Sequence, residues 1–181
     1  MDEQEFRSVL ARVAGERPIV GDLYRVGELS DVPERTGASV TLGVSAGQRW
    51  TEVHGIEGEL PSNVRIEGDQ VKISSESGPD DWNDVQGPDA EALRVFSLLD
   101  PRLVVDQLTR VEFLPDPTQA ICHIDLISWK PHLPDAFLKW LEGDAYDRPV
   151  IFQLEGGRLV ASSQPDLPPR RGDCIDIRFR Q

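Results

Sequence analysis

The chain has 181 residues, a formal net charge of −13 and 14 prolines. This length fits one domain, so we expect a single domain over residues 1–181 with a sizeable hydrophobic core. The strong negative charge argues against nucleic acid as a partner, because phosphate groups are bound by Lys and Arg side chains.

The sequence also limits the cellular location of the protein and the kinds of site that it can form. No window holds the roughly 18 consecutive apolar residues of a membrane helix, so we expect no membrane span. The first five residues, MDEQE, lack the basic and apolar regions of a signal peptide, which predicts a cytoplasmic location. Lysine occurs only three times beside many arginines, a bias that we associate with bacteria of high GC content. Cys122 and Cys174 belong to no CxxC motif, so we predict two thiols, no metal site and no cofactor.

The first predicted element is an amphipathic helix over residues 3–14. Its apolar residues recur every three or four positions, and Asp2 is a suitable N-cap. Gly15 is expected to end the helix.

From Ile19 the apolar residues alternate with a period of two, which predicts strands joined as antiparallel hairpins. We expect a bulge at Gly21, a polar loop over residues 31–37, and tight turns at residues 46–48 and 67–70. The acidic segment 76–88 is predicted to be a linker.

The second half begins with a helical pair, first over residues 89–99 and then from Asp100-Pro101 through Leu108. Two strands follow over residues 110–114 and 120–128, joined by a turn over 115–117. We then expect a short helix over 134–141, a hairpin over 150–161 and a Pro-rich loop over 164–172. The last strand, Cys174–Arg180, is a candidate edge strand whose arginines would resist pairing. Roughly nine strands with few helices give an α+β class with a largely antiparallel sheet.

The element order and the segment Leu99–Leu108 (LDPRLVVDQL) resemble the LolA/LppX/LprG-like lipoprotein carriers. The resemblance implies a strongly curved, open half-barrel around a cavity that binds an apolar ligand. The carriers are exported and are often lipidated on a cysteine, and neither feature is expected for this chain.

The residues that could carry chemistry are few. Cys122 and His123 point to opposite faces of a strand, so they do not form a local catalytic pair. His123 and Asp125 share a face and could orient an imidazole for base catalysis or metal binding. Alternatively, both side chains lie in solvent, or His123 is an ordinary core residue. Asp80–Asp84 lacks the spacing of a calcium loop.

The aromatic residues provide the other candidate site. Trp82 lies in a charged loop without a local core partner, so it could cover a pocket, contact a partner or fold back onto the core. The candidate ligand-binding residues are Trp50, Trp82, Trp129, His54 and His123.

Three functions are compatible with these features. We favour a non-enzymatic binding protein that holds an apolar small molecule or lipid-like ligand in a cavity of a curved sheet. The first alternative is an acidic protein-interaction module, such as an immunity protein or a regulatory partner. The second is an accessory enzyme that uses His123 and Asp125. The sequence does not predict the oligomeric state or the identity of a ligand or partner.

Overall fold

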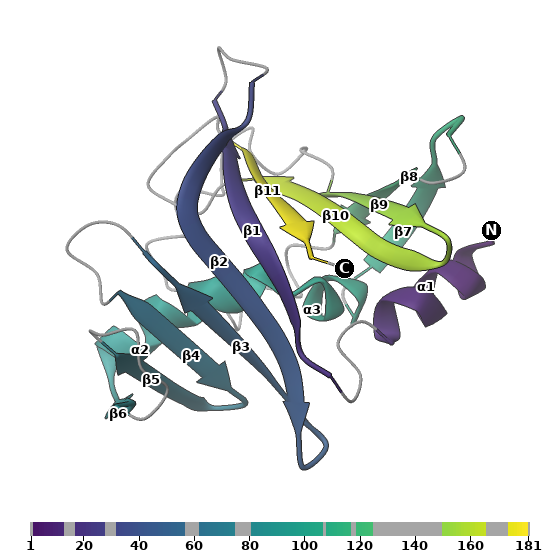
Figure 1. The fold of residues 1–181 in the computed structure, drawn as a ribbon. Helices are drawn as coiled ribbons and strands as arrows, with labels where there is room; N and C mark the ends of the chain where they lie inside the picture. The colour runs from purple at the N-terminus through teal and green to yellow at the C-terminus, as the bar shows by residue number, and fades with distance from the viewer. Residues whose placement is uncertain are drawn as a thin grey trace.

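The computed structural model describes residues 2–12, 17–27, 32–56, 62–74, 81–106, 108–116, 119–124, 150–165 and 174–180. Their dominant feature is one open, antiparallel sheet of eleven strands in the order β6-β5-β4-β3-β2-β1-β11-β10-β9-β8-β7 (Figure 1). This confirms a large antiparallel sheet with few helices. The strands are β1 Ile19–Val26, β2 Glu34–Ser45, β3 Gln48–His54, β4 Asn63–Glu67, β5 Gln70–Ser74, β6 Asn83–Val85, β7 Leu108–Phe113, β8 Gln119–Ile124, β9 Val150–Glu155, β10 Arg158–Pro165 and β11 Cys174–Phe179.

The described helices lie on one face of this sheet (Figure 1). They are α1 Glu3–Ala11, α2 Pro88–Leu93, the 3-10 helix η1 Arg94–Leu99 and α3 Pro101–Asp106. The N-terminal helix and the mid-chain helical pair are therefore confirmed. The helix predicted over residues 134–141 lies outside the described residues.

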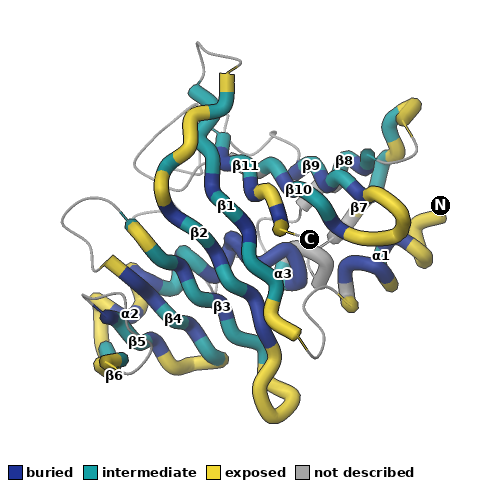
Figure 2. Tube along the Cα trace, viewed as in Figure 1, coloured by how far each residue is buried: buried dark blue, intermediate teal, exposed yellow. Residues whose placement is uncertain are grey.

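Buried and exposed side chains alternate along the strands, so the sheet has an inner face toward the core and an outer face. In β3, Thr51 and Val53 are buried, whereas Trp50, Glu52 and His54 on the other face are partly exposed. The buried positions of both sheet halves form the core with the helices (Figure 2). Helix α1 contributes Phe6, Val9 and Leu10, which have helical spacing.

Two predicted helix boundaries need correction. The Asp2 carboxylate accepts a hydrogen bond from the Glu5 backbone N–H at 2.7 Å, as expected for an N-cap. Helix α1, however, ends at Ala11 instead of residue 14. Similarly, α3 ends at Asp106, and Leu108 begins β7 because it pairs with Ile124 of β8.

Strand β11 lies at the centre of the sheet, between β1 and β10, so the predicted edge position of the last strand is wrong. The pairing with β1 also changes the role of Gly21. The bulge predicted there lies instead between Asp22 and Tyr24. A Cβ atom on Gly21 would lie 2.5 Å from Ile177 Cγ2, so glycine is required for the close approach of β11.

Three segments that were predicted to be loops are partly strands. In each of them, pairing with a neighbouring strand overrides the preference of polar residues for loops. Strand β2 begins at Glu34, inside the loop predicted over residues 31–37, and pairs with the end of β1. Strand β6 lies inside the predicted 76–88 linker and pairs with β5. Strand β10 extends to Pro165, inside the predicted 164–172 loop.

The hairpin turns are confirmed where they are described. Ala46 and Gly47 join β2 to β3 with φ values of 50° and 81°, the left-handed backbone of a two-residue hairpin turn. The β4–β5 turn at Gly68-Asp69 and the β9–β10 turn at Gly156-Gly157 also follow the prediction.

Asp22 provides a pH-dependent link among three central strands. Its carboxylate accepts hydrogen bonds from Arg180 at 2.5 Å and 3.0 Å and from Arg35 at 3.1 Å. The bonds from Arg180 contribute most, and the pKa of Asp22 falls from its ordinary 3.8 to about 2. A lowered pKa in the folded state stabilises the fold above the unfolded-state pKa, and that contribution is lost as the pH falls.

We therefore expect the stability difference between the wild type and Asp22→Asn to be full above about pH 4 and to shrink as the pH falls toward 2. Urea unfolding at pH 6, 4 and 2.5 measures this difference. Glu155→Gln, at the exposed β9–β10 turn, is the control for removing a carboxylate. If the difference in the free energy of unfolding between the wild type and Asp22→Asn does not change between pH 6 and pH 2.5, the lowered pKa of Asp22 is contradicted.

Candidate functional site

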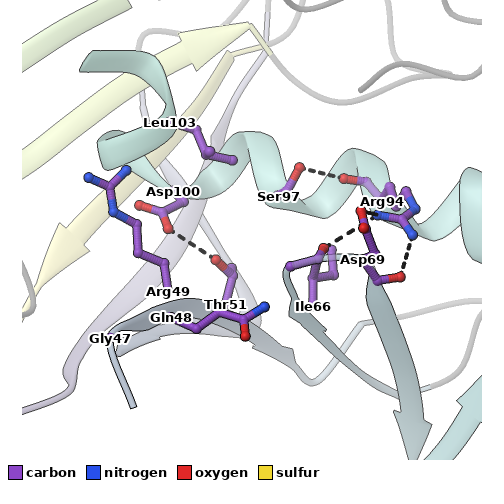
Figure 3. Close-up of a pocket in the computed structure, with 11 residues that line it drawn as sticks. Gly47, Gln48, Arg49, Thr51, Ile66, Asp69, Arg94, Ser97, Asp100 and Leu103 are labelled. Carbon is purple, nitrogen blue, oxygen red and sulfur yellow. Dashed lines mark hydrogen bonds and ion pairs between the residues drawn. The ribbon is translucent and has the colours of Figure 1, made fainter. Parts of the chain in front are cut away.

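A pocket of about 490 Å³ lies at one end of the β3–β4 part of the sheet (Figure 3). One wall comes from Gly47 of the β2–β3 turn with residues 48 and 49 at the start of β3, and from the β4–β5 turn, residues 68 and 69. The other wall comes from η1 and the start of α3. Tertiary packing therefore assembles the pocket from segments that are far apart in the sequence.

The pocket combines apolar surface with polar groups. Ile66 of β4 and Leu103 of α3 provide apolar side chains. Thr51 of β3 and Ser97 of η1 provide hydroxyl groups, and both residues are buried. The Ser97 hydroxyl donates a hydrogen bond to the Arg94 carbonyl at 2.6 Å.

A buried ion pair lies beside the pocket and fixes α3 on the sheet. The Arg102 side chain is 1% exposed and the Asp100 side chain 2%. Arg102 Nη2 donates to Asp100 Oδ2 at 2.7 Å, and Nε donates to Oδ1 at 2.8 Å. Arg102 also donates to the carbonyl oxygens of Gly43 at 2.9 Å and Trp50 at 3.1 Å.

The Asp100 carboxylate faces the pocket, but its hydrogen-bonding capacity is used. It accepts from the Arg102 guanidinium, from the Arg102 backbone N–H at 2.9 Å and from the Thr51 hydroxyl at 3.2 Å. A carboxylate offers about four acceptor positions, and these donors occupy them. Asp100 therefore holds the helix against β2 and β3, and its charge is compensated by Arg102.

Two further arginines stand at opposite ends of the pocket (Figure 3). Arg49, at the start of β3, donates to the Arg102 carbonyl at 3.4 Å. Arg94, in η1, donates to the Gly68 carbonyl at 3.4 Å and to the Asp69 carbonyl, and its guanidinium lies 3.7 Å from the Asp69 carboxylate. The arrangement allows a ligand with apolar and polar parts to be held between two guanidinium groups.

The predicted residues of β3 lie on the outer face of the sheet, opposite the pocket-facing Thr51. The Trp50 ring lies over Gly43 and under the Arg65 guanidinium, which is 4.7 Å from the ring centroid. His54 and Trp82 contact each other edge to face, with ring centroids 6.3 Å apart. The structure therefore brings His54 and Trp82 together, away from the pocket.

His54 belongs to a charged row on this outer face. The hydrogen bond with Glu52, at 3.1 Å, raises the pKa of His54 against the opposing effect of burial. Burial raises the pKa of Glu52, but the His54 hydrogen bond and the Arg65 charge outweigh it, so the net shift is downward. Arg65 bonds to Glu52 at 2.5 Å and to Glu67 at 3.1 Å. These groups pair with one another across β3 and β4.

The remaining predicted site residues are only partly located. His123 lies in β8, where its backbone pairs with Arg110 of β7. Asp125 and Trp129 lie outside the described residues, so the proposed His123–Asp125 pair stays a prediction. The roles of Trp50, His54 and Trp82 in ligand binding also stay predictions.

Sequence reasoning missed the residues that line the pocket, of which Arg49, Asp100 and Leu103 are the most informative. The sequence predicts Asp100 only as the start of a helix, although the run Asp100-Pro101-Arg102 places opposite charges two positions apart. Arg49 and Leu103 carry no local signal, because they meet only through tertiary packing.

The described part of the chain has neither a cluster of metal-ligating side chains nor a membrane-spanning helix. Among the residues that the structure describes, no three His, Cys, Asp or Glu side chains gather as a group that could hold a metal ion. No described helix is long and apolar enough to cross a membrane.

Comparison with known proteins finds no matching family model and no matching curated protein. Among solved structures, the chain is similar to a LolA superfamily protein from Nitrosomonas europaea, with 8% sequence identity and a TM-score of 0.40. The match covers 100% of this chain and 92% of that chain. Similarity at this level assigns neither a family nor a ligand to this protein.

Proposed function

We propose that this protein is a non-enzymatic binding protein that holds one small, apolar or lipid-like molecule in the pocket between η1, α3 and the β2–β3 and β4–β5 turns. The observation that carries the proposal is the pocket itself. Its volume of about 490 Å³ lies within the range of small-molecule sites, roughly 300–1,000 Å³.

The distribution of polar groups in the pocket supports binding over catalysis. Apolar side chains from two separate elements, Ile66 and Leu103, provide contact surface for a hydrocarbon group. Asp100, the buried carboxylate at the pocket, is engaged by Arg102 and Thr51, so it supports the walls of the pocket. The cytoplasmic location and the single domain remain parts of this proposal that come from the sequence.

Filling the pocket should abolish binding without unfolding the protein. Leu103 is partly exposed at the start of α3, so Leu103→Trp adds volume inside the pocket without disturbing the core. With the neutral apolar dye N-phenyl-1-naphthylamine, we expect the wild type to bind one dye per chain and the variant to show no detectable binding, because the dye loses its contact surface. Fluorescence titration measures both affinities.

Val32→Trp is the matched control, because Val32 is 69% exposed and does not line the pocket. Circular dichroism checks that all three proteins are folded. Equal dye binding by the wild type and Leu103→Trp would contradict the location of the site. A wild type that binds no dye would contradict the proposed function and favour the protein-interaction alternative.

A further inference from the structure

We infer that the ligand of this pocket is a neutral amphiphile, whose hydroxyl head group donates a hydrogen bond to the hydroxyl oxygen of Thr51 or Ser97 and whose hydrocarbon part contacts Ile66 and Leu103. The inference rests on the proposed function and specifies the chemical class of the ligand.

The first argument is the direction of the two hydroxyl protons that line the pocket. Thr51 is 4% exposed and Ser97 is 9% exposed. The Thr51 hydroxyl lies 3.2 Å from the carboxylate of Asp100, which is ion-paired with Arg102, and the Ser97 hydroxyl lies 2.6 Å from the Arg94 carbonyl. An ionised carboxylate and a carbonyl oxygen only accept hydrogen bonds, so both hydroxyls act as donors here. Each hydroxyl proton is therefore used within the protein.

The second argument is what the two hydroxyl oxygens still offer to a ligand. A hydroxyl oxygen has two acceptor positions beside its one proton. Among the described residues, none donates a hydrogen bond to Thr51 Oγ1 or to Ser97 Oγ. The two side chains come from facing walls, Thr51 from β3 and Ser97 from η1 (Figure 3). A ligand O–H group supplies the donor that these buried oxygens lack, whereas an ether or carboxylate oxygen has no proton to donate.

The third argument is the charge of the pocket, which favours a neutral head group. Each lining carboxylate has an arginine partner, because Asp100 lies 2.7 Å from Arg102 and Asp69 lies 3.7 Å from Arg94. An ammonium head group would therefore lack a counter-ion of its own. The lining arginines are engaged as well, Arg94 by Asp69 and by the carbonyls of the β4–β5 turn, and Arg49 by the Arg102 carbonyl. The charged groups thus hold the walls together.

The fourth argument is the apolar surface in the same pocket. Leu103 lies on the helical wall and Ile66 on the β4 wall (Figure 3). A hydrocarbon chain attached to the hydroxyl group gains contact with these side chains. A small polyol such as glycerol would leave this apolar surface without a contact.

The test compares ligands that share one alkyl chain and differ in head group. Isothermal titration at pH 7 with 1-octanol, methyl octyl ether, octanoate and octylammonium is carried out on the wild type, with glycerol as the ligand that has no alkyl chain. We expect the wild type to bind 1-octanol about fivefold or more tightly than the ether, because only the alcohol donates to the buried oxygens. Octanoate, octylammonium and glycerol should also bind more weakly than 1-octanol.

The double variant Thr51→Val with Ser97→Ala removes both acceptors. The ratio of the 1-octanol affinity to the ether affinity should fall to about one, since the hydrogen bond is lost for the alcohol alone. Each single variant should reduce the ratio, and the single variants replace the double variant if circular dichroism shows that it is unfolded. The matched control is Thr41→Val with Ser39→Ala, which removes two hydroxyls from partly exposed positions of β2 outside the pocket and should keep the ratio.

Four results would overturn the inference. The first is equal binding of 1-octanol and the ether by the wild type, which leaves the proposed function intact. The second is tighter binding of octanoate or octylammonium than of 1-octanol, which would make the ligand an ion. The third is an unchanged ratio in the folded variants of Thr51 and Ser97. The fourth is binding of glycerol as tight as that of 1-octanol. A wild type that binds none of the alkyl ligands would contradict the proposed function itself.

Discussion

Replacing Arg102 by leucine is expected to lower the free energy of unfolding by about 3–5 kcal/mol, because it leaves the buried Asp100 carboxylate without its counter-ion. The Asp100 side chain is 2% exposed, so water cannot replace the lost partner. The variant also removes the donors to the Gly43 and Trp50 carbonyls, which connect α3 to β2 and β3. Urea unfolding followed by circular dichroism measures the loss.

Two further variants separate the ion pair from simple packing. Arg110→Leu removes an exposed ion pair with Glu112 and should cost less than about 1 kcal/mol. The double variant Asp100→Leu with Arg102→Leu should be more stable than the sum of the two single losses predicts, because neither charge is left alone. A loss below about 1 kcal/mol for Arg102→Leu would show that this pair does not hold α3 on the sheet.

Truncation of Phe6 is the second change with a large expected effect. Phe6 is fully buried, and its ring centroid lies 6.0 Å from those of both Phe113 and Phe152. It therefore attaches α1 to the β7–β9 part of the sheet. Phe6→Ala should lower the free energy of unfolding by about 3–5 kcal/mol, which includes the cost of the cavity left behind.

Phe113→Ala is the matched control for this cluster, because it removes the same kind of ring from a residue that is 39% exposed. Phe113→Ala should lower the free energy of unfolding clearly less than Phe6→Ala, because the ring of Phe113 buries less apolar area. The free energies come from the same urea unfolding measurement. Equal losses for the two variants would contradict the central position of Phe6 in the core.

The sequence predicted those parts of the fold that depend on near neighbours. Alternation identified β2 and β3, and the left-handed turn at Ala46-Gly47 follows from residues that tolerate positive φ. The start of α3 at Pro101 follows from the fixed φ of proline. These features depend on interactions within a few residues.

The parts that were not predicted depend on contacts between distant segments. Nothing near Cys174 indicates that β11 pairs with β1, some 150 residues earlier in the chain. Arg102 is an ordinary helix residue by composition, and its burial depends on carbonyl oxygens of β2 and β3. The pocket is missed for the same reason, because Arg49 and Leu103 meet only after the hairpins pack on η1 and α3.

Ligand binding in the pocket can be tested by native mass spectrometry of the protein, purified without organic solvent, with a saturating amount of N-phenyl-1-naphthylamine. We expect one bound small molecule per wild-type chain, either the dye or a co-purified ligand. It should be lost on denaturation, and Leu103→Trp should bind neither. A wild type that carries no bound molecule, or a Leu103→Trp variant that carries the same one, would contradict the claim that this pocket is a ligand site.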